Sequence, residues 1–324
     1  MRSIILFVGL WMLLIGGCGS QEQVETAASP SNSASSSKVC ARKTKDTSFS
    51  SKCNGSSAAC SKRFDQVTFP MTHNSMSNSS EGWLYPNQTY GIQRQLQDGI
   101  RGFMLDTYYL NPSSLVQGTK SETLEVVNQV YLCHVFCSIG RRLLVEGLCD
   151  LVNFLDANPG EILSIIFEDY VSAEDTAQVM EAAGLTEYVY SHSVGTAWPT
   201  LREMIESNKR LVVFTETPRT GYSWMHSAWD QIWDTKYRYT STQQFDCATN
   251  RGSRSNSLFL MNHWLSSAEG LPQLSSASTA NDLSVLSGRV QSCYTDSGRY
   301  PTFIGVDGYD QGALLTLIQS LNGS

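Results

Sequence analysis

The stretch Val67-Thr-Phe-Pro-Met-Thr-His73-Asn74-Ser75-Met76 contains an apolar run that ends on a histidine. The pattern returns about sixty residues later in Val130-Tyr-Leu-Cys-His134. Histidine titrates near neutral pH, so one imidazole can take a proton from an attacking hydroxyl while the other protonates the leaving oxygen. The two runs therefore indicate phosphoryl-transfer chemistry, and a phosphodiesterase is the first hypothesis.

Two further apolar runs end on acidic side chains. One is Gly99-Ile-Arg101-Gly-Phe-Met104-Leu-Asp106, and the other is Glu161-Ile-Leu-Ser-Ile-Ile-Phe-Glu168-Asp169. In barrels of parallel strands the active site is built at the C-terminal ends of the strands. We therefore expect the ends of these four runs to meet at one end of such a barrel.

Strand-like and helix-like segments alternate along the chain. The patterns predict strands at 67–71, 100–105, 125–133, 162–167, 210–215, 258–262 and 302–306, and helices at 91–97, 141–155, 173–183, 201–207 and 312–321. Residues 217–256 show no clear periodicity and are expected to form long loops over the barrel mouth. Alternation implies parallel strands, and the number of units favours a single α/β barrel over an open sheet.

The order of these segments and their amino-acid sequences resemble the X domain of the phosphatidylinositol-specific phospholipase C family. Thr72-His73-Asn74-Ser75 resembles its first histidine motif, and His134 resembles its second histidine. The resemblance continues through Trp198-Pro-Thr-Leu-Arg-Glu-Met-Ile, Lys209-Arg-Leu-Val-Val-Phe-Thr215 and Phe303-Ile-Gly-Val-Asp307. It covers about residues 60–322, with its most specific part at 67–170. It implies a distorted TIM-type (β/α) barrel that cleaves phosphatidylinositol or a related lipid phosphodiester, releasing a cyclic phosphate.

The resemblance also implies roles for individual residues. His73 would be the general base and His134 the general acid. In the metal-dependent branch of the family, calcium is held by an Asn beside the first histidine, an acidic-x-Asp pair and a Glu. Asn74, Asp106 and Glu168 match three of these positions, whereas Met104 stands where the first acidic residue of the pair would be.

A cation is expected for a second reason. The metal-independent branch of the family places an arginine where Asp106 stands, and this chain has none there. The resemblance therefore implies Ca²⁺, with Mg²⁺ as the alternative, bound by oxygen ligands that suit a hard cation.

Three residues are weaker candidates for contacting the substrate or orienting the site. Arg101 could pair with Asp106 or Glu168. His263 ends the run Leu260-Met-Asn-His263 and could line the pocket or be packed in the core. Asp307 could orient His73 as a carboxylate partner.

The N-terminus has the features of an export signal. Arg2 precedes an apolar run from Ile4 to Ile15, which is too short to span a bilayer, and small residues lead to Cys18. This resembles a bacterial lipoprotein signal in which Cys18 is acylated, and an ordinary signal peptide with a chance cysteine is the alternative. Residues 19–39 would then be a disordered tether and residues 40–324 one catalytic domain. We expect an exported protein anchored to a bacterial envelope membrane, or else a secreted one.

Eight further cysteines fit up to four disulfides in an oxidising compartment. Cys40, Cys53 and Cys60 are expected to staple a small N-terminal segment, and Cys247 is expected to pair with Cys293. Zinc at Cys133, His134 and Cys137 is a weak alternative, because no second pair lies at zinc-finger spacing.

The net charge and composition limit the classes of partner that the sequence predicts. The net charge of −7 gives no reason to expect attraction to nucleic acid or to anionic lipid, and no protein partner is inferred. Two other functions remain open. One is a phosphodiesterase acting on glycerophosphodiesters or sphingolipids. The other is a non-catalytic protein that binds phosphoinositides or glycans, which Met104 favours and the two histidines disfavour.

Overall fold

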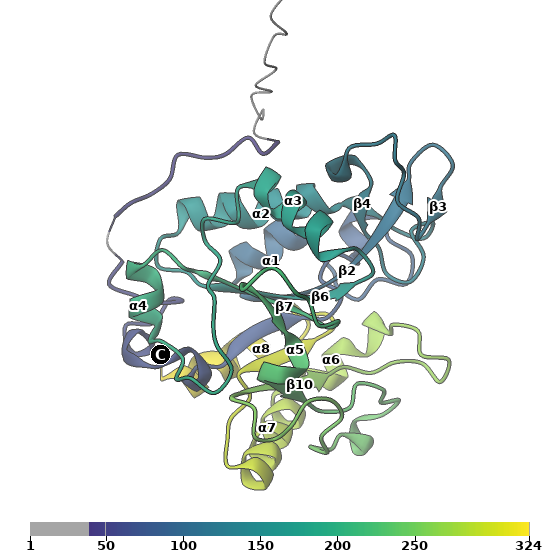
Figure 1. Cartoon of the computed structure of the whole chain (residues 1–324). Coiled ribbons are helices and arrows are strands. Elements are labelled where there is room, and N and C mark those ends of the chain that lie inside the picture. Colours follow the sequence, from purple (N-terminus) through teal and green to yellow (C-terminus); the bar gives the residue numbers. More distant parts are fainter. Residues whose placement is uncertain (1–38, 49, 324) are drawn as a thin grey trace, which may run out of the picture. The chain divides into compact units, whose positions relative to one another are not determined.

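Eight parallel strands form the centre of the fold (Figure 1). The computed structural model describes residues 39–48 and 50–323, which fall within one contact unit, Ser37–Ser324. The strand order is β8-β7-β6-β2-β1-β11-β10-β9. Their bounds are Met225–Ser227, Leu211–Thr215, Leu163–Asp169, Gly102–Asn111, Phe69–Thr72, Phe303–Val306, Leu258–His263 and Ile232–Asp234. The predicted signal segment, Cys18 and most of the predicted tether lie outside the described residues.

The row of strands is a barrel that does not close. Strands β8 and β9 end the row, and within the described chain they do not pair with each other. Only the short helix α5 (Ala228–Gln231) lies between them in sequence. The expected α/β fold with a distorted barrel is confirmed, and the distortion is this open seam.

The first and last barrel strands pair with each other. Phe69 is opposite Phe303, and the register runs to Thr72 opposite Val306. On its other side β1 pairs with β2, with Met71 opposite Gly102. A Cβ at Gly102 would lie 2.6–3.0 Å from side-chain atoms of Met71, so glycine permits this close approach. The carboxyl ends of β11, β1 and β2 are thereby brought together at one mouth.

Helices cover the outside of the strands and bury apolar faces against them. They are α1 (Ile92–Asp98), α2 (Leu144–Ala157), α3 (Ala173–Ala183), α6 (Ala277–Ala280), α7 (Leu283–Ser297) and α8 (Leu314–Asn322). Helix α4 (Leu201–Glu206) differs, because its Leu201 and Met204 belong to the cluster inside the barrel. In α2, apolar residues at helical spacing, such as Leu144, Leu148 and Leu151, are fully buried. A second cluster fills the barrel interior, where Phe64 packs on Phe69 with ring centroids 4.9 Å apart.

One predicted strand does not belong to the barrel. The prediction at 125–133 corresponds to β4 (Val130–Leu132), which pairs antiparallel with an extension of β2 beyond the barrel. Short strands β3 (Val116–Gln117) and β5 (Arg142–Leu143) pair with β2 and β4 respectively. Because β4 runs back along β2, its end returns to the level of Asp106, where Cys133 N–H donates to Asp106 O at 3.2 Å.

The loop prediction was wrong in part, and one long helix was not predicted. Residues 217–256 contain β8, α5 and β9, and Trp233 of β9 is buried in a stack on Phe259 with centroids 3.8 Å apart. Helix α7 was not predicted because its buried face includes Arg289, which weakens the apolar period.

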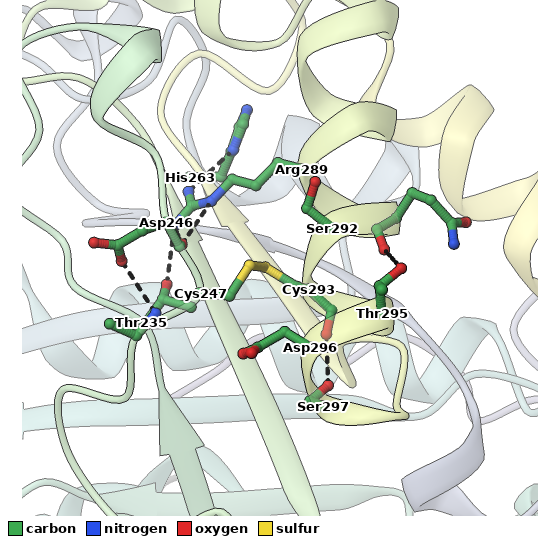
Figure 2. Close-up of a disulfide and its surroundings, with 12 residues drawn as sticks. Thr235, Asp246, Cys247, His263, Arg289, Ser292, Cys293, Thr295, Asp296 and Ser297 are labelled. Carbon is green, nitrogen blue, oxygen red and sulfur yellow. Dashed lines mark hydrogen bonds between the residues drawn. A yellow bond between two sulfur atoms is a disulfide. The ribbon is translucent and has the colours of Figure 1, made fainter.

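Four disulfides are present in the described chain, as the cysteine count predicted. Cys247 pairs with Cys293 as expected (Figure 2), and Cys53 pairs with Cys60. Cys40 instead pairs with Cys149 of α2, so it fastens the start of the domain to the helical layer and not to its own segment. Cys133 pairs with Cys137, which removes both as zinc ligands. Across residues 39–48 and 50–323, no helix is long and apolar enough to cross a membrane.

Candidate functional site

His73 follows β1 at the barrel mouth and is held by a carboxylate. Its Nδ1 lies 2.9 Å from Oδ1 of Asp307, the residue after β11. An ionised carboxylate can only accept, so the imidazole donates through Nδ1 and leaves a lone pair on Nε2. The parallel pairing of β1 and β11 places the two residues side by side. Asp307 therefore occupies the orienting position that the sequence predicted.

Several neighbours fix the plane of the His73 ring. Trp264 stacks on it with centroids 3.8 Å apart and an interplanar angle of 8°. Asn74 Nδ2 lies 3.1 Å from Nε2, and Asn87 Nδ2 donates to both oxygens of Asp307 at 3.1 and 3.2 Å. His73 keeps 22% of its side-chain surface exposed, so a ligand can reach the ring.

His134 lies in a tight loop closed by the Cys133–Cys137 disulfide. Within the described chain its ring has no hydrogen-bond partner, and the next residue, Val135, has a left-handed backbone with φ 61°. Burial and the nearby charge of His73 lower the pKa of His134 to about 4. The two rings therefore lie within electrostatic reach, and His134 is neutral at pH 7 when no anion is bound.

Three carboxylates lie in a row across the ends of β2, β6 and β7. Asp106 and Glu168 are partners in the register of β2 and β6, and Glu216 N–H donates to Phe167 O at 2.9 Å, which places Glu216 beside Glu168. Asp106 is buried, and among the described residues its carboxylate has no hydrogen-bond or ion-pair partner. Burial and the charges of Glu168 and Glu216 raise the pKa of Asp106 well above its usual range. A proton or a cation would relieve this excess of negative charge.

An arginine partly neutralises the row from the far side. Arg251 Nη1 donates to the two oxygens of Glu216 at 2.9 and 3.1 Å, and Nη2 donates to Asp234 at 2.6 Å. Its guanidinium stacks over Trp229 at 3.8 Å. Burial still raises the pKa of Glu216 to about 7, because it outweighs the lowering effect of Arg251.

Two of the weaker candidates lie outside the mouth. Arg101 precedes β2, at the opposite end of the strand from the mouth, and its Nε donates to Glu161 at 2.6 Å. It therefore cannot pair with Asp106 or Glu168. His263 is completely buried, donates through Nε2 to Ala280 O at 2.8 Å, and accepts from Arg289 at 3.2 Å (Figure 2). It is a packed core residue, and it does not line a pocket.

Two of the predicted metal ligands supply oxygens of the kind that a hard cation takes. The unpartnered Asp106 carboxylate beside Glu168 supplies the kind of oxygen that Ca²⁺ prefers. The described residues contain no group of three or more His, Cys, Asp or Glu side chains placed to hold a metal ion. With Met104 in place of an acidic residue, the protein offers Asp106, Glu168 and the amide of Asn74. Water and substrate would have to complete the shell.

Asn87 was not predicted as a site residue. Its replacement should disturb the orientation of Asp307 and His73 and leave substrate binding unchanged. Asn87→Ala removes the donor to Asp307. For the reaction proposed below we expect a roughly ten-fold lower kcat with little change in KM, in line with about 1.5 kcal/mol for a hydrogen bond to a charged group. Asn322→Ala is the matched control, because Asn322 bonds the backbone of Thr68 before β1 and not the mouth. Equal losses in both variants would make Asn87 a general structural residue.

Comparison with known proteins agrees with this architecture. The family model described as PI-PLC X 1 matches residues 59–322, so the chain belongs to the PI-PLC X domain family. The PI-PLC X domain-containing protein At5g67130 of Arabidopsis thaliana is 30% identical over 287 residues, covering 80% of this chain and 62% of that protein. A protein of Arthroderma benhamiae named "Uncharacterized secreted protein" is 27% identical over 285 residues, covering 80% of this chain and 60% of that protein. The chain thus spans about three fifths of the length of these relatives.

A solved structure is also similar. A mutant form of phosphatidylinositol-specific phospholipase C from Staphylococcus aureus shares 14% identity with a TM-score of 0.49, covering 77% of this chain and 88% of that one.

The four disulfides of this chain are consistent with export to an oxidising compartment.

Proposed function

We propose that the protein is a phosphodiesterase of phospholipase C type that cleaves phosphatidylinositol or a related lipid phosphodiester. The observation that supports this most is the pair of histidines at one mouth, of which His73 is oriented by Asp307 at 2.9 Å. Family membership agrees with the proposal. Transfer of a phosphoryl group to an attacking hydroxyl, with departure of an alkoxide, would use a base, an acid and a cation that the carboxylates could hold to offset the charge of the phosphate.

The two histidines have different proposed roles. His73, with a free lone pair on Nε2 once Asn74 moves aside, takes the proton from the attacking hydroxyl of the substrate. His134 protonates the leaving oxygen. The lowered pKa of His134, about 4, is a property of the unliganded site. A phosphodiester anion bound between the rings favours the protonated form, because an opposite charge nearby stabilises it.

The cation is part of the proposal. Asn74, Asp106 and Glu168 would hold Ca²⁺, or Mg²⁺ as the alternative, and the bound ion would offset charge on the phosphate oxygens and acidify the attacking hydroxyl. Asp106 contributes most because it is buried and has no other partner among the described residues.

A substrate panel tests the function. Purified full chain is assayed with phosphatidylinositol, sphingomyelin and glycerophosphodiesters, each with added calcium and with chelator. The proposal expects turnover of phosphatidylinositol with a cyclic phosphate as the first product. Turnover of only the other two substrates would support the alternative phosphodiesterase. Binding of a phosphoinositide head group without turnover of any substrate would support a binding protein.

Attachment to the membrane rests on Cys18, which lies outside the described residues. We expect Cys18→Ser to abolish acylation and to move the protein from the membrane fraction to the soluble fraction, while Cys40→Ser, which breaks a disulfide, leaves fractionation unchanged. The readouts are fractionation and the mass of the mature N-terminus. Membrane association of wild type without a lipid on that N-terminus would show that the signal is of the ordinary kind.

A further inference from the structure

The rings of His73 and His134 are supported in different ways. His73 has Asp307 as a hydrogen-bond partner and Trp264 as a stacking partner. Within the described chain the ring of His134 has neither a hydrogen-bond partner nor a stacked ring. The direction of the His134 side chain therefore depends mainly on the backbone that carries it.

That backbone is a tight and strained turn. Phe136 N–H donates to His134 O at 2.7 Å, a bond between residues two apart, and Val135 between them has a φ of 61°. A γ-turn with positive φ is rare and strained, and a β-branched residue seldom adopts this region. A turn of this kind persists only where its surroundings hold it. If it relaxed to negative φ, the side chain of His134 would swing away from its present direction.

A glutamine and a disulfide hold the turn. Gln117 lies on β3, where its Nε2 donates to Val135 O at 2.8 Å and its Oε1 accepts from Cys137 N–H at 2.8 Å. The Cys133–Cys137 disulfide closes the turn, and both cysteines are buried. Cys133 N–H also donates to Asp106 O at 3.2 Å. The turn is thus fixed to the hairpin of β2 and β3 at one edge of the barrel, and to the strand that carries Asp106 (Figure 1).

We propose that Gln117, Cys133 and Cys137 form a clamp that positions the ring of His134 to protonate the leaving oxygen. The proposal rests on the proposed function, because it gives the clamp a part in the same step. Gln117 is then a positioning residue that acts through His134. Precise placement matters, because a misplacement of about 1 Å can cost roughly 10²-fold in rate. The hairpin outside the barrel thereby supports the protonation step.

Gln117→Ala in the full chain is the first test, and Gln129→Ala is its matched control. Gln129 also holds a loop through both ends of its amide, donating to Ser121 O and Leu124 O and accepting from Ser121 N–H, but that loop does not carry His134. We expect Gln117→Ala to lower kcat for phosphatidylinositol by roughly 10- to 100-fold with little change in KM, and Gln129→Ala to leave kcat close to that of wild type. A substrate with an activated leaving group needs little protonation, so its turnover should fall far less.

Two further variants separate positioning from general stability. Val135→Asn, added to the first variant, should recover part of the lost kcat, because asparagine adopts positive φ with less strain and so keeps the turn. Cys133→Ala with Cys137→Ala should lose at least as much kcat as the first variant. Its control is Cys53→Ala with Cys60→Ala, which also removes a short-range disulfide, with a separation of 7 residues against 4, and should keep kcat.

Paramagnetic relaxation gives a readout that needs no turnover. The chain has five histidines, so isotope labelling of their rings gives few signals, and a soluble nitroxide broadens those that solvent reaches. We expect Gln117→Ala to increase the broadening of the His134 signal and to leave that of the fully buried His263 unchanged. If wild type turned over no substrate, the proposed function would fail, and this measurement alone would decide the clamp.

Three results would overturn the clamp. One is an equal loss of kcat in Gln117→Ala and Gln129→Ala at equal folded fractions. Another is a loss in Gln117→Ala that is as large for the activated leaving group as for phosphatidylinositol, because the clamp would then not act through protonation. The third is unchanged broadening of the His134 signal in both Gln117→Ala and the variant without the Cys133–Cys137 disulfide.

Discussion

Replacing His73 or His134 by alanine is expected to lower turnover of the proposed lipid phosphodiester substrate by roughly 10²- to 10⁴-fold, the range that general acid–base catalysis contributes. The physical reason differs for the two. His73→Ala removes the proposed base, which Asp307 orients, and His134→Ala removes the only proposed proton donor to the leaving oxygen. Substrates with an activated leaving group need little protonation, so they should restore much of the rate of His134→Ala and none of that of His73→Ala.

The control for both histidine variants is His192→Ala. His192 is half-buried in the loop before α4 and stacks on Trp198 with centroids 3.7 Å apart, so its loss should affect stability more than rate. Steady-state rates are compared at matched folded fractions, judged by circular dichroism. A folded His73→Ala or His134→Ala variant with near-normal turnover would make that histidine structural and would remove the two-histidine mechanism.

Chelation is expected to remove activity, and added calcium is expected to restore it. A metal contributes several kcal/mol by stabilising charge in the transition state, which corresponds to a loss of at least about 10²-fold. Asp106→Ala should weaken calcium binding by at least the roughly 10- to 100-fold that loss of a supporting residue costs at metal sites. Met104→Glu should tighten binding, because it supplies the acidic ligand that the chain lacks.

Calorimetric titration of calcium separates binding from turnover in these variants. Asp296→Asn is the matched control, since Asp296 pairs with Arg254 away from the mouth. Full activity in chelator, with no metal in the purified protein, would contradict the cation. Arg251 would then be the residue to test for phosphate binding, although Glu216 and Asp234 already engage it.

The sequence predicted the barrel because parallel strands buried on both faces read as continuous apolar runs. Strand β6 (Leu163–Asp169) and helix α3 (Ala173–Ala183) lie within two residues of their predicted bounds. Strand β4 was placed in the barrel because an apolar run does not reveal whether its pairing is parallel or antiparallel. Its end still returns to the mouth, since β4 doubles back along the extended β2.

The neighbours of the predicted site residues were harder to find. Glu216 directly follows the apolar run of β7, so the rule that predicted Asp106 and Glu168 would also have found it. Asn87, Arg251 and Trp264 lie beyond or between regular elements, and no periodic signal marks them. Their contacts with the mouth exist only once distant segments meet. His263 was an ambiguous candidate because a buried strand end and a pocket-facing one look alike in sequence.

The pairing of β1 with β11 determines when the site can form during folding. β1 shares four register pairs with β11 and two with β2, so its main support comes from a strand at the far end of the chain. Contacts between such distant segments form slowly, because a long loop must close before they are made. His73 cannot meet Asp307 until the last strand has emerged from the ribosome or the export channel. The nascent chain therefore carries His73 without the carboxylate that orients it, and the pair can form only after β11 has been made.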